Sequence, residues 1–167
     1  MDTDVEVLKS LDDLLQYDAV SGFEAQDRIQ TGLMACREGQ ELFKELLSDY
    51  KNAHFIRTDG TYDTTTNVTR ITNICLKYGL KLNNNLQTVK GFTLFPCDYF
   101  CPKDSETKEL NLTKNSITIH HFDGSWLTKE QKLQKELQLK YSKFIPKKIA
   151  GYIAKFVAIK RVKGFEE

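Results

Sequence analysis

Strand-like and helix-like segments alternate along this chain of 167 residues, and their order constrains the fold more than any other feature. Segment 116–120 alternates β-branched residues as a half-buried strand does, whereas segment 67–77 has apolar residues at helical spacing and ends before Gly79. Alternating elements of this kind build the α/β class of fold, in which helices cover a sheet. With 40% hydrophobic residues, the chain is long enough for one domain with its own core.

The remaining segments also alternate between short predicted strands and helices. Gly32 should interrupt strand structure within 29–35, and the polar stretch 103–114 should form a surface hairpin or loop. Thr128 and Gln131 match a capping box, so we expect a helix to begin there. The other predicted strands are 5–8, 19–23 and 92–95, and the other predicted helices are 11–15, 41–47 and a segment after Pro146.

Cysteine usage and hydropathy indicate a cytoplasmic protein. The four cysteines match no zinc-binding spacing, so we expect reduced, structural thiols. The N-terminus is acidic and lacks the apolar segment of a signal peptide, and no run of apolar residues is long enough to cross a bilayer.

Two carboxylates, Asp2 and Asp4, stand at the start of the chain, directly before the strand predicted at 5–8. At a strand end both side chains can reach one divalent cation. Hard oxygen ligands favour Mg²⁺ or Mn²⁺, which retain open positions for phosphate oxygens. The pattern is weak by itself, because most acidic residues are simply solvated.

A second concentration of functional groups follows the strand at 116–120. His120 and His121 are adjacent, and Ser125 and the single tryptophan, Trp126, come shortly after them. Neighbouring strand residues face opposite sides, so only one imidazole can join a given site. Alternatively, Trp126 anchors the core and the histidines make local hydrogen bonds; the residues leave both interpretations open.

Taken in order, segments 2–9, 22–24 and 119–126 resemble the family 32 glycosyltransferases, which have a sugar-binding region containing an Asp-x-Asp motif. This family includes bacterial capsular polysaccharide transferases and fungal mannosyltransferases. The resemblance extends over residues 2–128. It implies a GT-A-like fold and retaining transfer of a sugar from a UDP- or GDP-sugar donor to a glycan or lipid-linked acceptor.

The resemblance also implies a metal site. Asp2 and Asp4 would bind the Mn²⁺ or Mg²⁺ that bridges the donor diphosphate. Either His120 or His121 would join them, since some members of the family favour the first position and related transferases favour the second. No carboxylate stands out as the catalytic group.

Five further residues are candidates for substrate contacts. By resemblance, Ser125 and Trp126 would close over the donor diphosphate. Glu24, Asp27 and Asn67 are candidate sugar or acceptor contacts because they follow predicted strands or begin a helix. The alternative for these three is a structural role in caps and turns, where Asn and Asp are common.

The resemblance begins at the Asp pair, so we expect the fold to lack the N-terminal half that binds the nucleotide in GT-A enzymes. A sheet without those strands would expose an edge, which favours a homo-oligomer or a strand-swapped dimer. A non-catalytic remnant or self-associating module is therefore the alternative function. An Asp-x-Asp phosphatase is less favoured, because Glu6 stands where Thr or Val is expected and no apolar strand precedes Asp2.

Charge divides the chain into an acidic body and a basic tail. Residues 1–128 hold 13 basic and 19 acidic residues, whereas residues 129–167 hold 11 and 4. We therefore expect two parts, 1–128 and 129–167, and no nucleic-acid binding, because the body would repel phosphates. Segment 146–163 has the pattern of a basic amphipathic helix, which would either contact the inner face of the plasma membrane peripherally or pack on its own domain.

Overall fold

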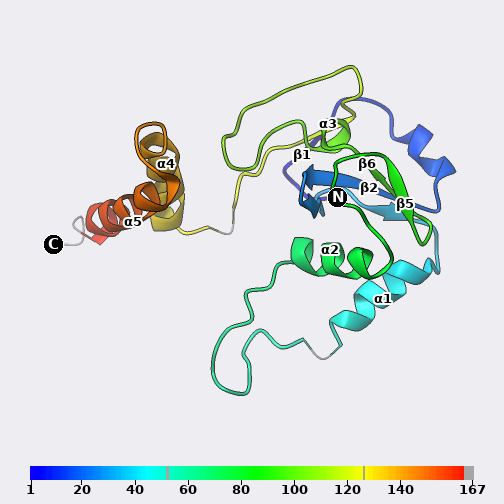
Figure 1. Ribbon diagram of the computed structural model, residues 1–167, viewed down its shortest axis with the longest axis horizontal. Coiled ribbons are helices and arrows are strands. Elements are labelled where there is room, and N and C mark those ends of the chain that lie inside the picture. Colours follow the sequence, from blue (N-terminus) through cyan, green and yellow to red (C-terminus); the bar gives the residue numbers. More distant parts are fainter. Residues whose placement is uncertain (52, 126, 164–167) are drawn as a thin grey trace. The chain divides into compact units, whose positions relative to one another are not determined.

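The computed structural model describes residues 1–51, 53–125 and 127–163, with Lys163 described by its backbone alone. It has a mixed α/β architecture, in which a sheet is accompanied by helices (Figure 1). The α/β class is therefore confirmed, while the GT-A-like assignment stays a prediction. The chain forms two compact units, Met1–His121 and Phe122–Glu167.

The main sheet of the first unit is built around two buried strands, β2 (Ala19–Ala25) and β6 (Phe92–Phe95), which run parallel. Their residues are apolar or small along most of their length, as expected for strands covered on both faces. Three short strands pair antiparallel around them. These are β3 (Arg28–Ile29) and β4 (Ala35–Cys36), both beside β2, and β5 (Gln87–Val89) beside β6.

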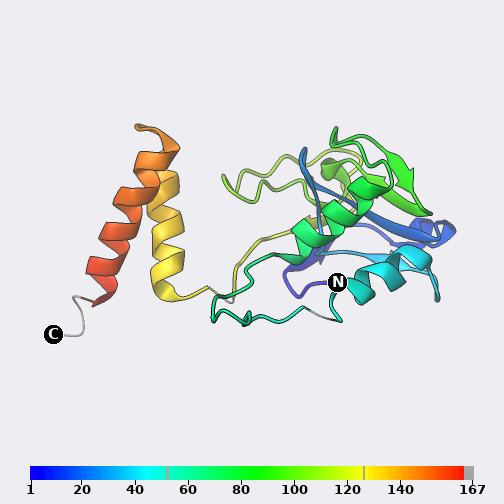
Figure 2. The same cartoon turned by 60° about the horizontal axis from the view of Figure 1, so that its bottom comes forward.

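Two amphipathic helices, α1 (Glu41–Asp49) and α2 (Asn67–Lys77), cover one face of this sheet (Figures 1 and 2). The helix predicted at 67–77 is confirmed. It begins at Asn67 because Thr66 caps it by accepting a hydrogen bond from the backbone N–H of Thr69. Buried apolar side chains from both helices and from the sheet form one cluster. Its members include Phe23, Leu42, Ile71, Ile74, Phe92 and Leu94.

The other face of the sheet carries a second apolar cluster. It includes Leu14 of the 3₁₀ helix η1 (Asp12–Gln16) and Phe100 of the short helix α3 (Cys97–Phe100). Phe100 packs so closely on Gly22 that a Cβ there would lie 2.7 Å from its ring. A side chain at position 22 would therefore push α3 away from the sheet.

Within 29–35 the strand structure is interrupted more widely than Gly32 alone predicts. After β3 the N–H of Gln30 still donates to the carbonyl of Gly22 in β2 at 3.0 Å, but the next strand, β4, begins only at Ala35. Gln30 stabilises this break, because its buried side chain accepts a hydrogen bond from the backbone N–H of Leu33 at 2.8 Å and donates one to the Leu33 carbonyl. The side chain thus satisfies backbone groups that a strand would pair with a neighbour.

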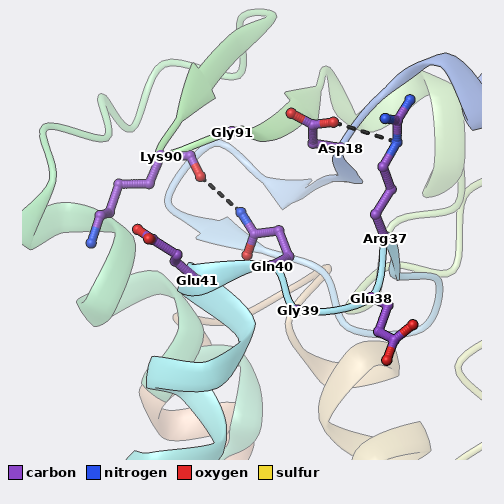
Figure 3. A pocket seen from close by; sticks show the side chains of 8 residues that line it. All are labelled: Asp18, Arg37, Glu38, Gly39, Gln40, Glu41, Lys90 and Gly91. Carbon is purple, nitrogen blue, oxygen red and sulfur yellow. Dashed lines mark hydrogen bonds and ion pairs between the residues drawn. The ribbon is translucent and has the colours of Figure 1, made fainter.

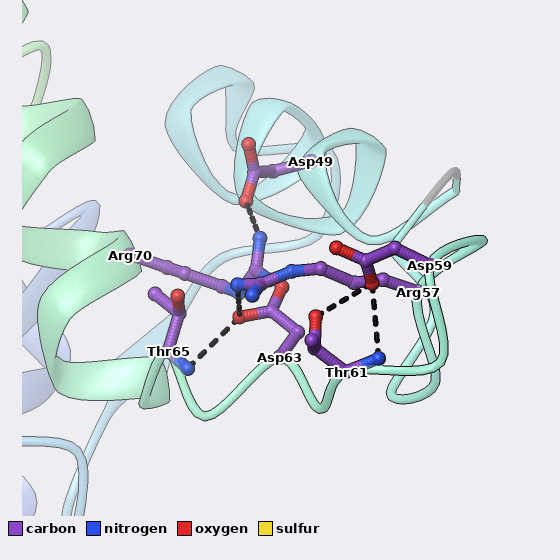
Figure 4. Close-up of polar contacts among 7 residues, drawn as sticks. All are labelled: Asp49, Arg57, Asp59, Thr61, Asp63, Thr65 and Arg70. Atoms are coloured by element: carbon purple, nitrogen blue, oxygen red, sulfur yellow. Dashed lines mark hydrogen bonds and ion pairs between the residues drawn. The ribbon is translucent and has the colours of Figure 1, made fainter.

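The segment between α1 and α2 is held to the helices by charge (Figure 4). Arg70 of α2 contacts Asp49 of α1 and Asp63 of the connecting segment, both at 2.8 Å. Asp63 also accepts a hydrogen bond from the backbone N–H of Thr65 at 3.0 Å. Arg70 therefore links both helices to the segment that leads to the start of α2.

A two-stranded sheet completes the first unit. It pairs β1 (Val5–Val7) antiparallel with β7 (Thr118–His120), with Val5 opposite His120. Strands were predicted at both places, although β7 is shorter than the predicted 116–120.

The second unit is a helical hairpin of α4 (Lys129–Tyr141) and α5 (Lys147–Lys163). The capping box of Thr128 and Gln131 is confirmed: each side chain accepts a hydrogen bond from the other's backbone N–H. In the part of the chain that the structure describes, no helix is both long and apolar enough to cross a membrane.

Candidate metal site

The pairing of β1 with β7 brings the two candidate motifs together. Because the strands are antiparallel, the start of β1 lies beside the end of β7, and the N–H of His121 donates to the carbonyl of Asp4 at 2.9 Å. Asp2, Asp4 and His120 each place one ligand atom within 4.8 Å of the others. We call this group the Asp2–Asp4–His120 cluster.

Within the cluster, Nε2 of His120 lies 3.4 Å from Oδ1 of Asp4. Both side chains are largely buried, with exposed fractions of 13% and 23%, whereas Asp2 is exposed. The cluster therefore has an inner side held by protein and an outer side open to solvent. Two carboxylates and one imidazole suit a cation such as Mn²⁺, and the open side leaves room for exchangeable ligands.

Gly32 supports two members of the cluster at once. Its carbonyl accepts a hydrogen bond from the N–H of Asp2 at 2.7 Å. The His120 ring packs on its Cα, so a Cβ there would lie 2.8 Å from Nδ1. The sequence marked Gly32 only as a strand breaker, and no local signal reveals its contact with a residue so distant in the chain.

The imidazole of His121 is not part of the cluster and makes a different contact. Its Nε2 is 2.9 Å from Oε2 of Glu6. The residues alone did not choose between the two histidines, and the structure brings only His120 to the aspartates. Sequence reasoning missed Glu6 as a histidine partner. Glu6 lies opposite Ile119 and so shares a face with His121, two residues further along, and this register could not be read from the sequence.

Asn67 connects the start of α2 to the segment that supports the cluster. Its Nδ2 donates to Oγ1 of Thr31 at 3.0 Å, and Thr31 directly precedes Gly32. This contact is structural, and a role in binding a sugar or acceptor stays a prediction.

Glu24 and Asp27 both lie beside Arg28. The guanidinium Nε of Arg28 is 3.1 Å from Glu24 and 3.7 Å from Asp27. Glu24 is the better shielded of the two, with 13% of its side chain exposed against 70% for Asp27. Neither belongs to the Asp2–Asp4–His120 cluster, and their predicted sugar contacts stay predictions.

Of the two predicted diphosphate contacts, the structure describes one. Ser125 is an exposed turn residue of the second unit. Trp126 lies outside the residues that the structure describes.

A shallow hollow of about 340 Å³ at the start of α1 includes none of the predicted site residues (Figure 3). Arg37 contacts Asp18 across it at 3.4 Å, and the Gln40 side chain donates to the carbonyl of Lys90 at 2.8 Å. These polar groups bind one another, and Gln40 also caps α1. We therefore assign the hollow a structural role, joining α1 to the turn between β5 and β6.

Compared with protein-family models, with curated proteins and with solved structures, the chain matches none of them.

Proposed function

We propose that this chain provides the cation site of a retaining glycosyltransferase, which transfers a sugar from a UDP- or GDP-sugar to a glycan or lipid-linked acceptor in capsular or cell-surface polysaccharide synthesis. The observation that carries the proposal is the Asp2–Asp4–His120 cluster. Its members come from two of the three segments on which the resemblance to family 32 glycosyltransferases rests, 2–9 and 119–126, although more than a hundred residues separate these two segments in the chain.

In this proposal each residue has a distinct task. The carboxylates of Asp2 and Asp4 and Nε2 of His120 hold Mn²⁺ or Mg²⁺, and the packing of Gly32 fixes the His120 ring. A cation bound there offsets the negative charge that develops on the departing diphosphate. The exposed side of Asp2 leaves the diphosphate free to approach. Ser125 and Trp126 are proposed as diphosphate contacts by the resemblance alone.

Binding of Mn²⁺, followed by electron paramagnetic resonance, tests the cation site directly. Wild-type protein should bind Mn²⁺, whereas Asp4→Asn and His120→Gln should each weaken binding at least about tenfold, as loss of a direct ligand does. Asp13→Asn is the matched control, because Asp13 is an exposed carboxylate of η1 outside the cluster. Equal Mn²⁺ binding by Asp4→Asn and Asp13→Asn would refute the assignment.

Calorimetry with UDP and GDP then separates a transferase from a non-catalytic module. The glycosyltransferase proposal requires nucleotide binding that depends on Mn²⁺ and is lost in Asp4→Asn. Mn²⁺ binding with no response to either nucleotide would instead support the second candidate, a self-associating module.

The second candidate is favoured by the sheet of β1 and β7. Among the residues that the structure describes, β1 pairs with β7 alone, and most of β1 is exposed. An unpaired strand edge of this kind can add a strand from another copy of the chain.

A further inference from the structure

We propose that the hairpin of α4 and α5 is an interfacial binding module for anionic phospholipids, and that it lies along a membrane surface through one face of α5. The proposal rests on the second unit alone. It stands whether or not the chain transfers a sugar.

The face of α5 that packs in the hairpin consists of small residues. Ala150, Ala154 and Ala158 recur every four positions and are fully buried. Gly151 adds a further small residue near α4, and a Cβ there would meet only the side chain of Gln138, at 3.4 Å from Nε2. Because small residues occupy this face, the large apolar side chains of α5 lie elsewhere on the helix.

Those large side chains point to solvent. The exposed fractions are 50% for Ile149, 69% for Tyr152, 41% for Ile153 and 60% for Phe156. We call these four residues the outer face of α5. At 100° per residue they share one side of the helix, so the chain presents a continuous apolar stripe of the kind that marks an interaction site.

Cations border the outer face of α5. The helix carries no acidic residue, and Nζ of Lys160 lies 4.9 Å from the centre of the Phe156 ring. A shallow groove of about 240 Å³ lies beside Tyr152 and is lined also by Lys148, Lys155, Gln134 and Gly151. We call it the lysine groove.

This combination fits one class of partner. Aromatic and aliphatic side chains enter the boundary between head groups and acyl chains, while neighbouring lysines attract anionic head groups. A phosphate of a lipid fits the lysine groove, whose lining has two cations and no acid. An acidic protein would match the cations, but it would not explain so broad an apolar stripe between them.

The test uses the full chain and vesicles of phosphatidylcholine with or without phosphatidylglycerol, separated by sedimentation. We expect binding to the anionic vesicles, weakening as salt rises, and little binding to neutral ones. The variant Tyr152→Ser with Phe156→Ser, called the outer-face variant, should bind anionic vesicles at least about tenfold more weakly, because two apolar anchors are lost. Lys148→Gln with Lys155→Gln should reduce it about fivefold for each cation removed and flatten the salt dependence.

Leu15→Ser with Leu47→Ser is the matched control, because these leucines are 75% and 72% exposed and belong to the first unit. The control should bind vesicles as wild type does. The outer-face variant should keep its helices, because neither substituted side chain is buried in the hairpin. Circular dichroism checks this.

Three outcomes would overturn the proposal. The first is that anionic vesicles fail to bind, or bind the outer-face variant as strongly as wild type. The second is a dimer in sedimentation equilibrium that the outer-face variant abolishes, since a second copy would then cover the stripe. The third is full competition by inorganic phosphate at matched ionic strength, which would indicate a site for the free anion.

Discussion

At the scale of single residues, Gly32 joins two distant parts of the chain, because it contacts both Asp2 and His120. Gly32→Ala should displace the His120 ring, lower Mn²⁺ affinity and destabilise the fold by about 1–3 kcal/mol, as overpacking does. Urea denaturation and Mn²⁺ titration measure the two effects.

Gly151→Ala is the control for this prediction. A Cβ at position 151 would meet only the flexible end of Gln138, at 3.4 Å, and alanine favours a helix interior. We expect stability to be unchanged or higher in this variant. If Gly32→Ala behaves in the same way, the packing of His120 on Gly32 has no influence on the site.

The cysteines should differ sharply in reactivity. Burial raises the pKa of Cys75 to about 12, with Glu45 adding to the effect, and burial also raises the pKa of Cys101. A thiol reacts through its thiolate, so both should resist a disulfide reagent at neutral pH until the protein unfolds.

Cys36 is exposed, so it should react first when the folded protein is titrated with the disulfide reagent and should produce the fast phase of the reaction. Cys36→Ser should remove that phase and leave the slow ones unchanged. A fast phase that persists in Cys36→Ser would show that another thiol is accessible in the folded protein.

At the scale of elements, Arg70 holds the segment between α1 and α2 by its contacts with Asp49 and Asp63. Arg70→Gln should release this segment and increase protease cleavage within 53–65, measured by mass spectrometry of the fragments. Arg37→Gln is the matched control, because Arg37 contacts Asp18 at an exposed position. Equal cleavage in the two variants would contradict the role of Arg70.

The same contacts predict a dependence on pH. The hydrogen bond from the Thr65 side chain lowers the pKa of Asp63, and its backbone N–H, Arg57 and Arg70 act in the same direction. A lowered folded-state pKa stabilises the native state where the carboxylate is ionised. That stabilisation is present above about pH 3.9, the ordinary pKa of aspartate, and is lost as the pH falls through the folded-state value. The protection factors of the amides within 53–65, which compare the exchange rate with the intrinsic rate at each pH, should therefore fall in acid, and less so in Arg70→Gln.

Local patterns in the sequence predicted the elements that local forces define. Helix α2 and the capping box at Thr128 depend on contacts within a few residues, so periodicity and cap residues revealed them. The two-residue strands β3 and β4 and the short helix α3 depend on distant partners. The same reasoning therefore located β3 and β4 only as interrupted strand structure within 29–35, and it missed α3.

For the same reason, the sequence predicted only part of the candidate site. Asp2, Asp4 and a histidine could be named, since their side chains are metal ligands by chemistry. The choice of His120 needed the register of β1 against β7, and the role of Gly32 needed a contact across the unit. Neither the register nor this contact can be inferred from the residues next to His120 or Gly32 in the sequence.

At the scale of the whole molecule, the sheet of β1 and β7 should govern self-association. The N–H groups of Leu8 and His121 bond across the pair, so by the alternation of a strand the N–H of Val7 faces the outer edge. Val7→Pro should keep the pairing with β7 but block an added strand, lowering the dimer fraction measured by light scattering. Val7→Ala is the control, and a dimer that survives Val7→Pro would exclude this edge.

The parallel pairing of β2 with β6 also has a kinetic consequence. Ala19 lies opposite Phe92, so α1, α2 and their connecting segment must be enclosed before the central sheet can form. Such non-local closure makes for slow folding, but its entropic cost rises only with the logarithm of the enclosed length. Natural variants of this fold could therefore lengthen or shorten the segment between α1 and α2 at little thermodynamic cost, provided that Asp63 still reaches Arg70.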